Sequence, residues 1–285
     1  MLAPGSRAGD YVIVRLADVG GASNVYLARH LQSGAHAAVK VPSASASLQQ
    51  ELVARFHNEA QTLLELQHFY LVKALAFGVL TDEGLPFLVL EWLPTSLHAL
   101  LRQQGGRLSL GDGLQVLRQL ANVFCFLHGR GVIHRDLKPE NVLLANALPG
   151  ALEVRLADLG LARLVPEEGA PHPPLPVSTA RGALFGTGEY MAPEQWGTPK
   201  GVDAKVDVYS LGALAFHLLV GEPPFGSGAL PGLSFNHMVR PPPLDRLEGL
   251  ASESLRTLVG AMLAKVASRR PSMRDVLLAL ENLEA

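Results

Sequence analysis

The stretch that most constrains this chain is an octapeptide, residues 134–141, which reads HRDLKPEN. It places a carboxylate at Asp136, an ammonium two residues later at Lys138 and an amide five residues later at Asn141. A carboxylate can accept a proton from a hydroxyl group, an ammonium can neutralise a phosphate, and an amide oxygen can hold a hard cation. The octapeptide therefore predicts either a reactive loop or a charged surface turn.

The composition is typical of a globular protein with a substantial core. Of the 285 residues, 48% are hydrophobic and 18% are charged, and the formal net charge is -2. A chain of this length can form one large domain or two lobes around a cleft. The near-neutral charge offers no basic surface for nucleic acid or for an anionic membrane, so we expect neither partner.

Cysteine usage and the lack of long apolar runs predict a cytoplasmic protein. Cys125 is the single cysteine, so no intramolecular disulfide is possible, which fits a reducing compartment. It lies in the apolar run 123–127, which predicts a small core residue rather than a reactive thiol. The sequence has no signal-peptide pattern and no run of about 18 apolar residues.

The first ninety or so residues contain runs that are typical of short strands. These runs are residues 11–16, 25–31, 36–41, 74–79 and 86–90. Between the first two lies Asp18–Ser23, where Gly20 and Gly21 would let backbone N–H groups approach a phosphate. An ordinary hairpin turn is the alternative interpretation.

Two charged residues of this region lie among apolar neighbours and need partners. Lys40 ends the run AAVK at residues 37–40, where an unpaired ammonium would be costly. Residues 48–66 have helical periodicity, with Ser47 and Gln50 as a capping box. Glu59 falls on the apolar face of this helix.

The larger C-terminal part is predicted to be mostly helical, with two short strands. Ser109 and Asp112 start a helix that ends at Gly129, and further helices follow Ser252 and Ser272. The strands are residues 142–144 and 154–157, and the second leads into Asp158, a good position for a metal ligand. Asp207 lies inside an apolar helix, where its carboxylate must accept hydrogen bonds.

Several of these segments, taken together and in order, resemble the protein kinase superfamily. They are AAVK at 37–40, HRDLKPEN at 134–141, DLG at 158–160 and GTGEYMAPE at 186–194. By this resemblance, KPEN at 138–141 favours serine/threonine over tyrosine specificity. The absence of disulfides, membrane anchors and appended domains suggests a compact bacterial-type kinase. The resemblance implies an α+β kinase fold: a lobe at 1–91 with a five-stranded antiparallel sheet and one helix, and a mainly helical lobe at 92–285. Together they would form one domain from about residue 10 to 285.

The resemblance also implies roles for individual residues. Asp136 would deprotonate the acceptor hydroxyl, Lys138 would stabilise the transferred phosphoryl group, and Asn141 and Asp158 would hold Mg²⁺. Lys40 would pair with Glu59 and position the phosphates of ATP, although a purely structural ion pair is the alternative. The residues expected to contact ATP are Gly20, Gly21, Val25, Ala38, Lys40, Glu59, Leu90, Glu91, Leu93 and Leu143.

Other resemblances concern regulation and architecture. Residues 165–185 occupy the place of an activation loop, with Ser178 and Thr179 as candidate phosphosites that Arg135 and Arg163 would bind. A disordered linker is the alternative. Residues 186–194 would form a shelf for a protein substrate, with Thr187 touching the site. Arg270 would pair with Glu194, and Asp207 would anchor the loop that contains Asp136.

The expected function is transfer of the γ-phosphate of ATP to serine and threonine hydroxyls of proteins, including this chain itself through a transient homodimer. Only the middle glycine of the family's glycine-rich loop is kept, because Asp18 and Ser23 stand at the other two positions. A carboxylate near triphosphate is repulsive unless it points away. The alternative is therefore a nucleotide-binding pseudokinase that acts as a signalling scaffold. A small-molecule phosphotransferase is disfavoured by the shelf at 186–194.

Overall fold

The structure, a computed structural model, describes residues 1–20, 23–43, 50–81, 84–159, 163–164, 188–196 and 202–284. Side chains are described within these ranges except at 50–55, 58–59 and 163–164. The chain divides into two compact units, Met1–Pro94 and Thr95–Ala285. The predicted lobe boundary after residue 91 stays a prediction.

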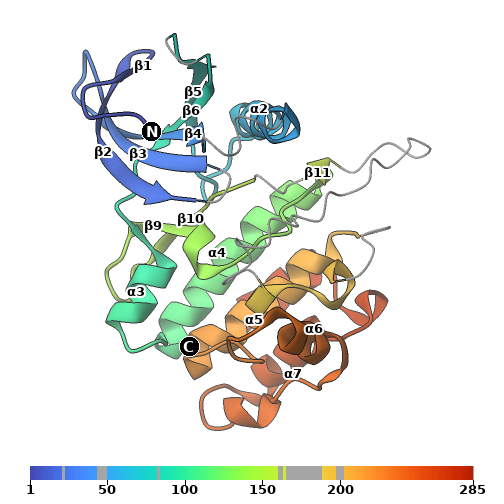
Figure 1. The fold of residues 1–285 in the computed structure, drawn as a ribbon. Coiled ribbons are helices and arrows are strands. Elements are labelled where there is room, and N and C mark those ends of the chain that lie inside the picture. Colours follow the sequence, from blue (N-terminus) through green and yellow to red (C-terminus); the bar gives the residue numbers. More distant parts are fainter. Residues whose placement is uncertain are drawn as a thin grey trace. The chain divides into compact units, whose positions relative to one another are not determined.

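The N-terminal unit is built on one antiparallel sheet in the order β1-β2-β3-β4-β6-β5 (Figure 1). Its strands are β1 (Arg7–Ala8), β2 (Tyr11–Val19), β3 (Ser23–His30), β4 (His36–Pro42), β5 (Ala74–Val79) and β6 (Pro86–Glu91). All five predicted strands are present. The predicted strand count was wrong by one, because the short β1 pairs with the start of β2 and adds a sixth strand.

The core of this sheet consists of alternate side chains from neighbouring strands. Tyr26, Val39 and Val89 are almost fully buried in one cluster with Phe87. Gly78 opposes Phe87 on the neighbouring strand, where an added Cβ would lie 2.7 Å from the aromatic ring. A glycine is therefore required for Phe87 to pack at this position.

One long helix, α2 (Gln50–Glu65), accompanies the sheet and packs against β5 and β6. It confirms the helix predicted over 48–66, and its buried side chains are Phe56, Ala60 and Leu63, spaced as one helical face. Ser47, the predicted cap of this helix, lies outside the described residues.

The C-terminal unit is mainly helical (Figure 1). Its helices are α3 (Leu97–Gln103), α4 (Leu110–His128), α5 (Lys205–Val220), α6 (Leu230–Val239), α7 (Glu253–Met262) and α8 (Met273–Glu281). Short 3₁₀ turns are η1 (Pro139–Asn141), η2 (Gly188–Tyr190), η3 (Pro193–Gln195), η4 (Leu244–Leu247) and η5 (Ala267–Arg269). Among the described helices, none is long and apolar enough to cross a membrane.

Helix α5 is the centre of this unit because it is apolar on all sides and packs against α4, α7 and α8. The predicted N-caps are confirmed: the side chains of Ser109, Ser252 and Ser272 accept the N–H groups of Asp112, Leu255 and Asp275. Gly221 ends α5 in the left-handed conformation, with a φ of 99°.

Short strands hold the loops between these helices. They are β7 (Thr95–Ser96), β8 (Val132–Ile133), β9 (Val142–Asn146), β10 (Glu153–Leu156) and β11 (Arg163–Leu164). Strand β9 pairs with both β7 and β10, and β8 pairs with β11. The octapeptide at 134–141 therefore begins at the end of β8 and runs through η1 into β9.

Candidate active site

The charged groups of the octapeptide are brought into direct contact. The Lys138 Nζ atom lies 2.8 Å from the Asp136 Oδ2 atom, and the Asn141 Nδ2 atom donates to the same oxygen at 3.1 Å. Asn141 also donates to the backbone carbonyl of Asp136 at 2.8 Å. Among the described residues, the Asp136 Oδ1 atom has no hydrogen-bond donor, which leaves this oxygen for the proton of a hydroxyl group.

Lys138 stays positively charged although its side chain is partly buried. Desolvation lowers the pKa of Lys138, but the charge and hydrogen bond of Asp136 more than offset it, with smaller contributions from Asp158 and Glu140. The net effect is a raised pKa. The side chain is thus a stable cation beside Asp136, suited to a phosphate group.

Asp207, on α5, supports the octapeptide, and its carboxylate accepts three hydrogen bonds. Its Oδ2 atom accepts the N–H of His134 at 3.0 Å, and its Oδ1 atom accepts the N–H of Arg135 at 2.8 Å. The His128 Nε2 atom lies 2.8 Å from Oδ2. The predicted anchoring role of Asp207 is therefore confirmed.

The Asp207 carboxylate is fully buried, yet it is ionised. Burial alone would raise its pKa. The hydrogen bond and electrostatic contribution of His128, the electrostatic contribution of His134 and the N–H of Arg135 together lower it below its ordinary value. This buried anion is thus fully paired, which is the condition under which burial of a charge is tolerated.

The ring of His134 joins the loop to the end of β10. Its Nε2 atom lies 3.0 Å from the carbonyl oxygen of Ala157, which can only accept, so Nε2 carries the proton. The Nδ1 atom then accepts the N–H of Asp136 at 3.2 Å. His134 is fully buried, so this ring fixes the loop backbone immediately before the Asp136 side chain.

Two residues of the site have the left-handed backbone conformation that glycine usually adopts. Among the described residues that are not glycine, only Arg135 (φ 71°) and Asp158 (φ 65°) have positive φ. Such a conformation costs about 1–3 kcal/mol and persists only where neighbours impose it. At Arg135 the imposing neighbours include Asp207.

Asn141 and Asp158 have the donor atoms that a hard cation accepts. Because the Asn141 Nδ2 atom donates to a carbonyl oxygen, its amide orientation is fixed and Oδ1 is the atom left for a cation. The N–H of Ala157 donates to the carbonyl of Asn141 at 2.8 Å, which ties the residue before Asp158 to Asn141. The donor set, one amide oxygen and one carboxylate, fits Mg²⁺ that takes its other ligands from phosphate and water.

The end of the predicted shelf is fixed by an ion pair between the buried Arg270 and the half-buried Glu194. Arg270 donates from Nη1 and Nη2 to the two carboxylate oxygens of Glu194 at 2.6 and 2.8 Å. Its remaining N–H groups donate to the carbonyls of Ala264, Lys205 and Lys265. The predicted pairing of Arg270 with Glu194 is confirmed, and it is bidentate.

A second link, through Gln195, connects this segment to the octapeptide. The Gln195 Nε2 atom donates to the carbonyl of Arg135 at 3.0 Å, and its Oε1 atom accepts the N–H of Ala192 at 2.9 Å. Sequence reasoning missed Gln195 and also His128. Neither has a local signal, because their partners lie 60 and 79 residues away in the sequence.

The N-terminal unit contains most of the residues predicted to contact ATP. Lys40 is buried on β4, opposite Val25 on β3, and Ala38 lies opposite Leu90 on β6. Glu91 ends β6 and uses its own N–H to donate to the carbonyl of Lys73 at 2.9 Å. Leu93 follows this strand. In the C-terminal unit, Leu143 is half-buried on β9.

Gly20 closes the turn between β2 and β3. Its N–H donates to the carbonyl of Ser23 at 2.9 Å, and an added Cβ would lie 2.7 Å from that oxygen. The carboxylate of Asp18 accepts the N–H of Val19 at 2.9 Å. This turn therefore needs glycine at position 20, and the Asp18 charge is partly satisfied by its own backbone.

Several predicted residues cannot be placed. Gly21, Gly160, Ser178, Thr179 and Thr187 lie outside the described residues, as do the side chains of Glu59 and Arg163. The Lys40–Glu59 pair and the roles assigned to the loop at 165–187 therefore stay predictions.

Comparison with known proteins agrees with this geometry. The protein kinase domain family matches residues 11–279 of the chain. The serine/threonine-protein kinases Pkn1 and pkn2 of Myxococcus xanthus are each 37% identical to it, over 84% and 95% of this chain. Serine/threonine-protein kinase PknB of Mycobacterium tuberculosis is 30% identical over 96% of this chain.

These relatives are longer proteins. The matched regions cover 33% of Pkn1, 32% of pkn2 and 42% of PknB, so the chain spans about a third to two fifths of their lengths. The family match covers almost the whole of this chain and includes every group of the site. The chain therefore belongs to the protein kinase domain family.

Proposed function

We propose that this chain is a serine/threonine protein kinase that transfers the γ-phosphate of ATP to hydroxyl groups of proteins, including its own. The observation that carries the proposal is the contact of Asp136 with Lys138 and Asn141 on a loop held by Asp207. Its similarity to Pkn1, pkn2 and PknB supports serine and threonine as acceptors. Autophosphorylation of one copy by another would proceed through a transient homodimer.

In this proposal each group of the loop has one task. The free Oδ1 atom of Asp136 accepts the proton of the acceptor hydroxyl while the Lys138 ammonium stabilises negative charge on the transferred group. The Asp136 side chain keeps its orientation because Asn141 and Lys138 both contact its Oδ2 atom. Phosphoryl transfer depends mostly on such positioning and on charge stabilisation.

Asn141 and Asp158 would hold Mg²⁺, which neutralises phosphate charge when it is bound. Lys40 and Glu59, together with Gly20, Gly21 and Val25, are the residues that we assign to the phosphates. Ala38, Leu90, Leu143 and the backbone of Glu91 and Leu93 are assigned to adenine. We place the activity in the cytoplasm, where ATP is available.

The pseudokinase alternative rests on Asp18 and Ser23 in the glycine-rich turn. The hydrogen bond from Val19 to the Asp18 carboxylate weakens this argument, because it reduces the repulsion that Asp18 would exert on a phosphate. Lys40, Asp136, Asn141 and Asp158 all have the residue types that phosphoryl transfer needs. We therefore favour an active enzyme.

The test is phosphate transfer from radiolabelled ATP with Mg²⁺ to a generic protein acceptor. Asp136→Asn should lower the turnover at least about 100-fold, as loss of a general base does. Asp245→Asn, at an exposed position on η4, is the matched control and should retain full turnover. Transfer that is absent from folded wild-type protein, or equal in the Asp136 variant, would contradict the proposal.

A further inference from the structure

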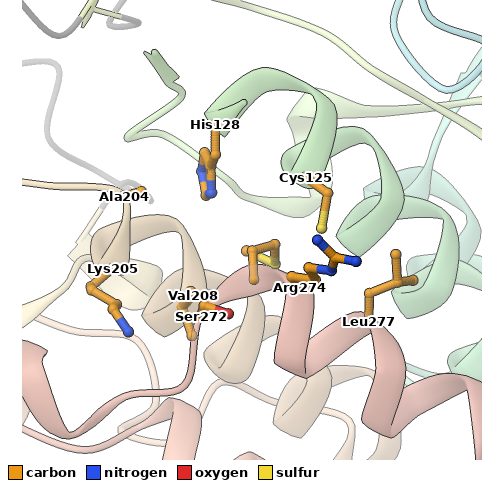
Figure 2. A pocket seen from close by; sticks show the side chains of 9 residues that line it. Cys125, His128, Ala204, Lys205, Val208, Ser272, Arg274 and Leu277 are labelled. Atoms are coloured by element: carbon orange, nitrogen blue, oxygen red, sulfur yellow. The ribbon is translucent and has the colours of Figure 1, made fainter. Parts of the chain in front are cut away.

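The C-terminal unit contains a cavity of about 510 Å³ where the end of α4 meets the beginnings of α5 and α8 (Figure 2). Among the residues lining it are Cys125, His128, Val208, Met273, Arg274 and Leu277. Its volume lies within the range of small-ligand sites. Nothing in the proposed phosphoryl transfer uses this cavity.

Among the described residues that line the cavity, apolar side chains accompany one cation without a hydrogen-bonded partner, Arg274. Figure 2 shows the Arg274 guanidinium near the sulfur of Cys125, between α8 and α4. Arg274 is exposed and makes no hydrogen bond or ion pair with another described residue. None of the lining residues is acidic, although the carboxylate of Glu281 lies close enough to Cys125 to raise the pKa of its thiol. The walls are therefore complementary to a ligand that has an apolar body and a negative head group.

Neighbouring charges do not neutralise Arg274 by direct pairing. The carboxylate of Asp275 accepts the N–H and the hydroxyl of Ser272, at 3.0 and 2.6 Å. The Lys205 ammonium donates to the carbonyl of Arg270. Arg274 is thus the cation that remains for a bound anion.

The cavity also adjoins the residues that hold the octapeptide in place. His128 lines the cavity, and its Nε2 atom lies 2.8 Å from the carboxylate of Asp207. The same carboxylate holds the backbone N–H groups of His134 and Arg135. A ligand that displaces the His128 ring would therefore loosen the backbone next to Asp136.

We propose that this cavity is a regulatory site for a small amphipathic carboxylate. The head group pairs with Arg274, the apolar tail lies against Val208 and Leu277, and occupancy lowers phosphoryl transfer through His128 and Asp207. The regulatory part of this proposal rests on the proposed kinase function, whereas the binding part does not.

Cys125 allows binding to be measured directly, because it is the single cysteine of the chain and lines the cavity. Its alkylation by iodoacetamide, followed by mass spectrometry of the intact protein, reports on this cavity alone. Burial raises the pKa of the Cys125 thiol despite the nearby Arg274, so the reaction is run at alkaline pH. Octanoate is the probe, and we expect it to slow alkylation more than octan-1-ol at the same concentration.

A pair of arginine variants tests the head-group contact. Arg274→Ala should weaken protection by octanoate about ten-fold, as loss of a charge-assisted hydrogen bond does. Arg240→Ala removes an exposed arginine at the end of α6 and should leave the protection unchanged. Equal alkylation rates with and without octanoate, or equal protection in the Arg274 variant, would overturn the site.

A pair of leucine variants tests the cavity without a ligand. Leu277→Trp fills the cavity and should slow alkylation of Cys125, whereas Leu278→Trp, on the exposed side of α8, should not. An unchanged alkylation rate in the Leu277 variant would contradict the cavity as the route to Cys125.

Phosphate transfer is the separate readout for regulation. Octanoate should lower the turnover of wild type and of Arg240→Ala but not of Arg274→Ala, whose basal turnover should equal that of wild type. Protection of Cys125 without any change in turnover would overturn the regulatory part. If the chain had no kinase activity, the alkylation experiment would still decide whether the site binds the carboxylate.

Discussion

The single residue on which the octapeptide depends most is Asp207. Its buried carboxylate accepts two backbone N–H groups and faces the His128 ring, so an amide cannot replace both of its acceptor oxygens. Asp207→Asn should lower the free energy of unfolding by about 1–3 kcal/mol, the cost of an unsatisfied buried donor. Urea denaturation at neutral pH measures this, with Asp245→Asn as the exposed control.

The same residue predicts a pH dependence of stability. The pKa of Asp207 in the folded state lies below its ordinary value of 3.8. Its contribution to stability is therefore complete above that value and is lost as the pH falls through the folded-state pKa. Between about pH 4 and pH 2, Asp207→Asn should lose less stability than wild type. Parallel curves for the two proteins would contradict this linkage.

Gln195 is a positioning residue for Asp136, because its amide joins Ala192 to the carbonyl of Arg135, where the backbone is left-handed. Gln195→Glu keeps the acceptor for Ala192 but removes the donor to Arg135. We expect kcat to fall about ten-fold, equivalent to about 1.4 kcal/mol, with the KM for ATP unchanged.

Steady-state kinetics separates this role from a merely structural one. Gln104→Glu makes the same chemical change at an exposed position beyond α3 and should leave kcat unchanged. A rise in the KM for ATP without a fall in kcat would mean that Gln195 supports ATP binding and does not orient Asp136.

At the scale of elements, the packing of α5 against α7 leaves no room beside Gly212. An added Cβ there would lie 2.8 Å from the Cβ of Met262, an atom that cannot rotate away. Gly212→Ala should therefore lower the free energy of unfolding by about 1–3 kcal/mol. At Gly232 in α6, nothing lies within 4 Å, so Gly232→Ala should raise it by about 0.4–1 kcal/mol. Thermal unfolding of the two variants measures both changes. A change in the same direction for both variants would contradict the packing argument.

The elements also show which features a sequence reveals. Helices that begin with a capping serine, such as those after Ser109, Ser252 and Ser272, were predicted because the signal is local. The need of Asp207 for hydrogen-bond donors was predicted because a carboxylate in an apolar helix must accept hydrogen bonds, whereas the Arg270–Glu194 pair was predicted from the resemblance to protein kinases. Helix α3 has only seven residues, and α6 contains a proline and a glycine near its start, so both were missed. Two-residue strands such as β1 exist only through pairing with distant or adjacent segments, which periodicity cannot show.

At the scale of the whole molecule, a nucleotide that binds the folded chain and not the unfolded chain should raise the free energy of unfolding. A ligand at about 100 times its Kd stabilises the folded state by about 2.7 kcal/mol. We expect ATP with Mg²⁺ to raise the Tm of wild type, and EDTA to remove the part of the increase that depends on the metal.

Asp158→Asn should lose only the metal-dependent part of this increase, because the substitution removes one metal-binding carboxylate. Asp10→Asn, at an exposed position before β2, should behave as wild type. Absence of any shift in wild type would contradict ATP binding, and a full Mg²⁺-dependent shift in the Asp158 variant would contradict its role as a metal ligand.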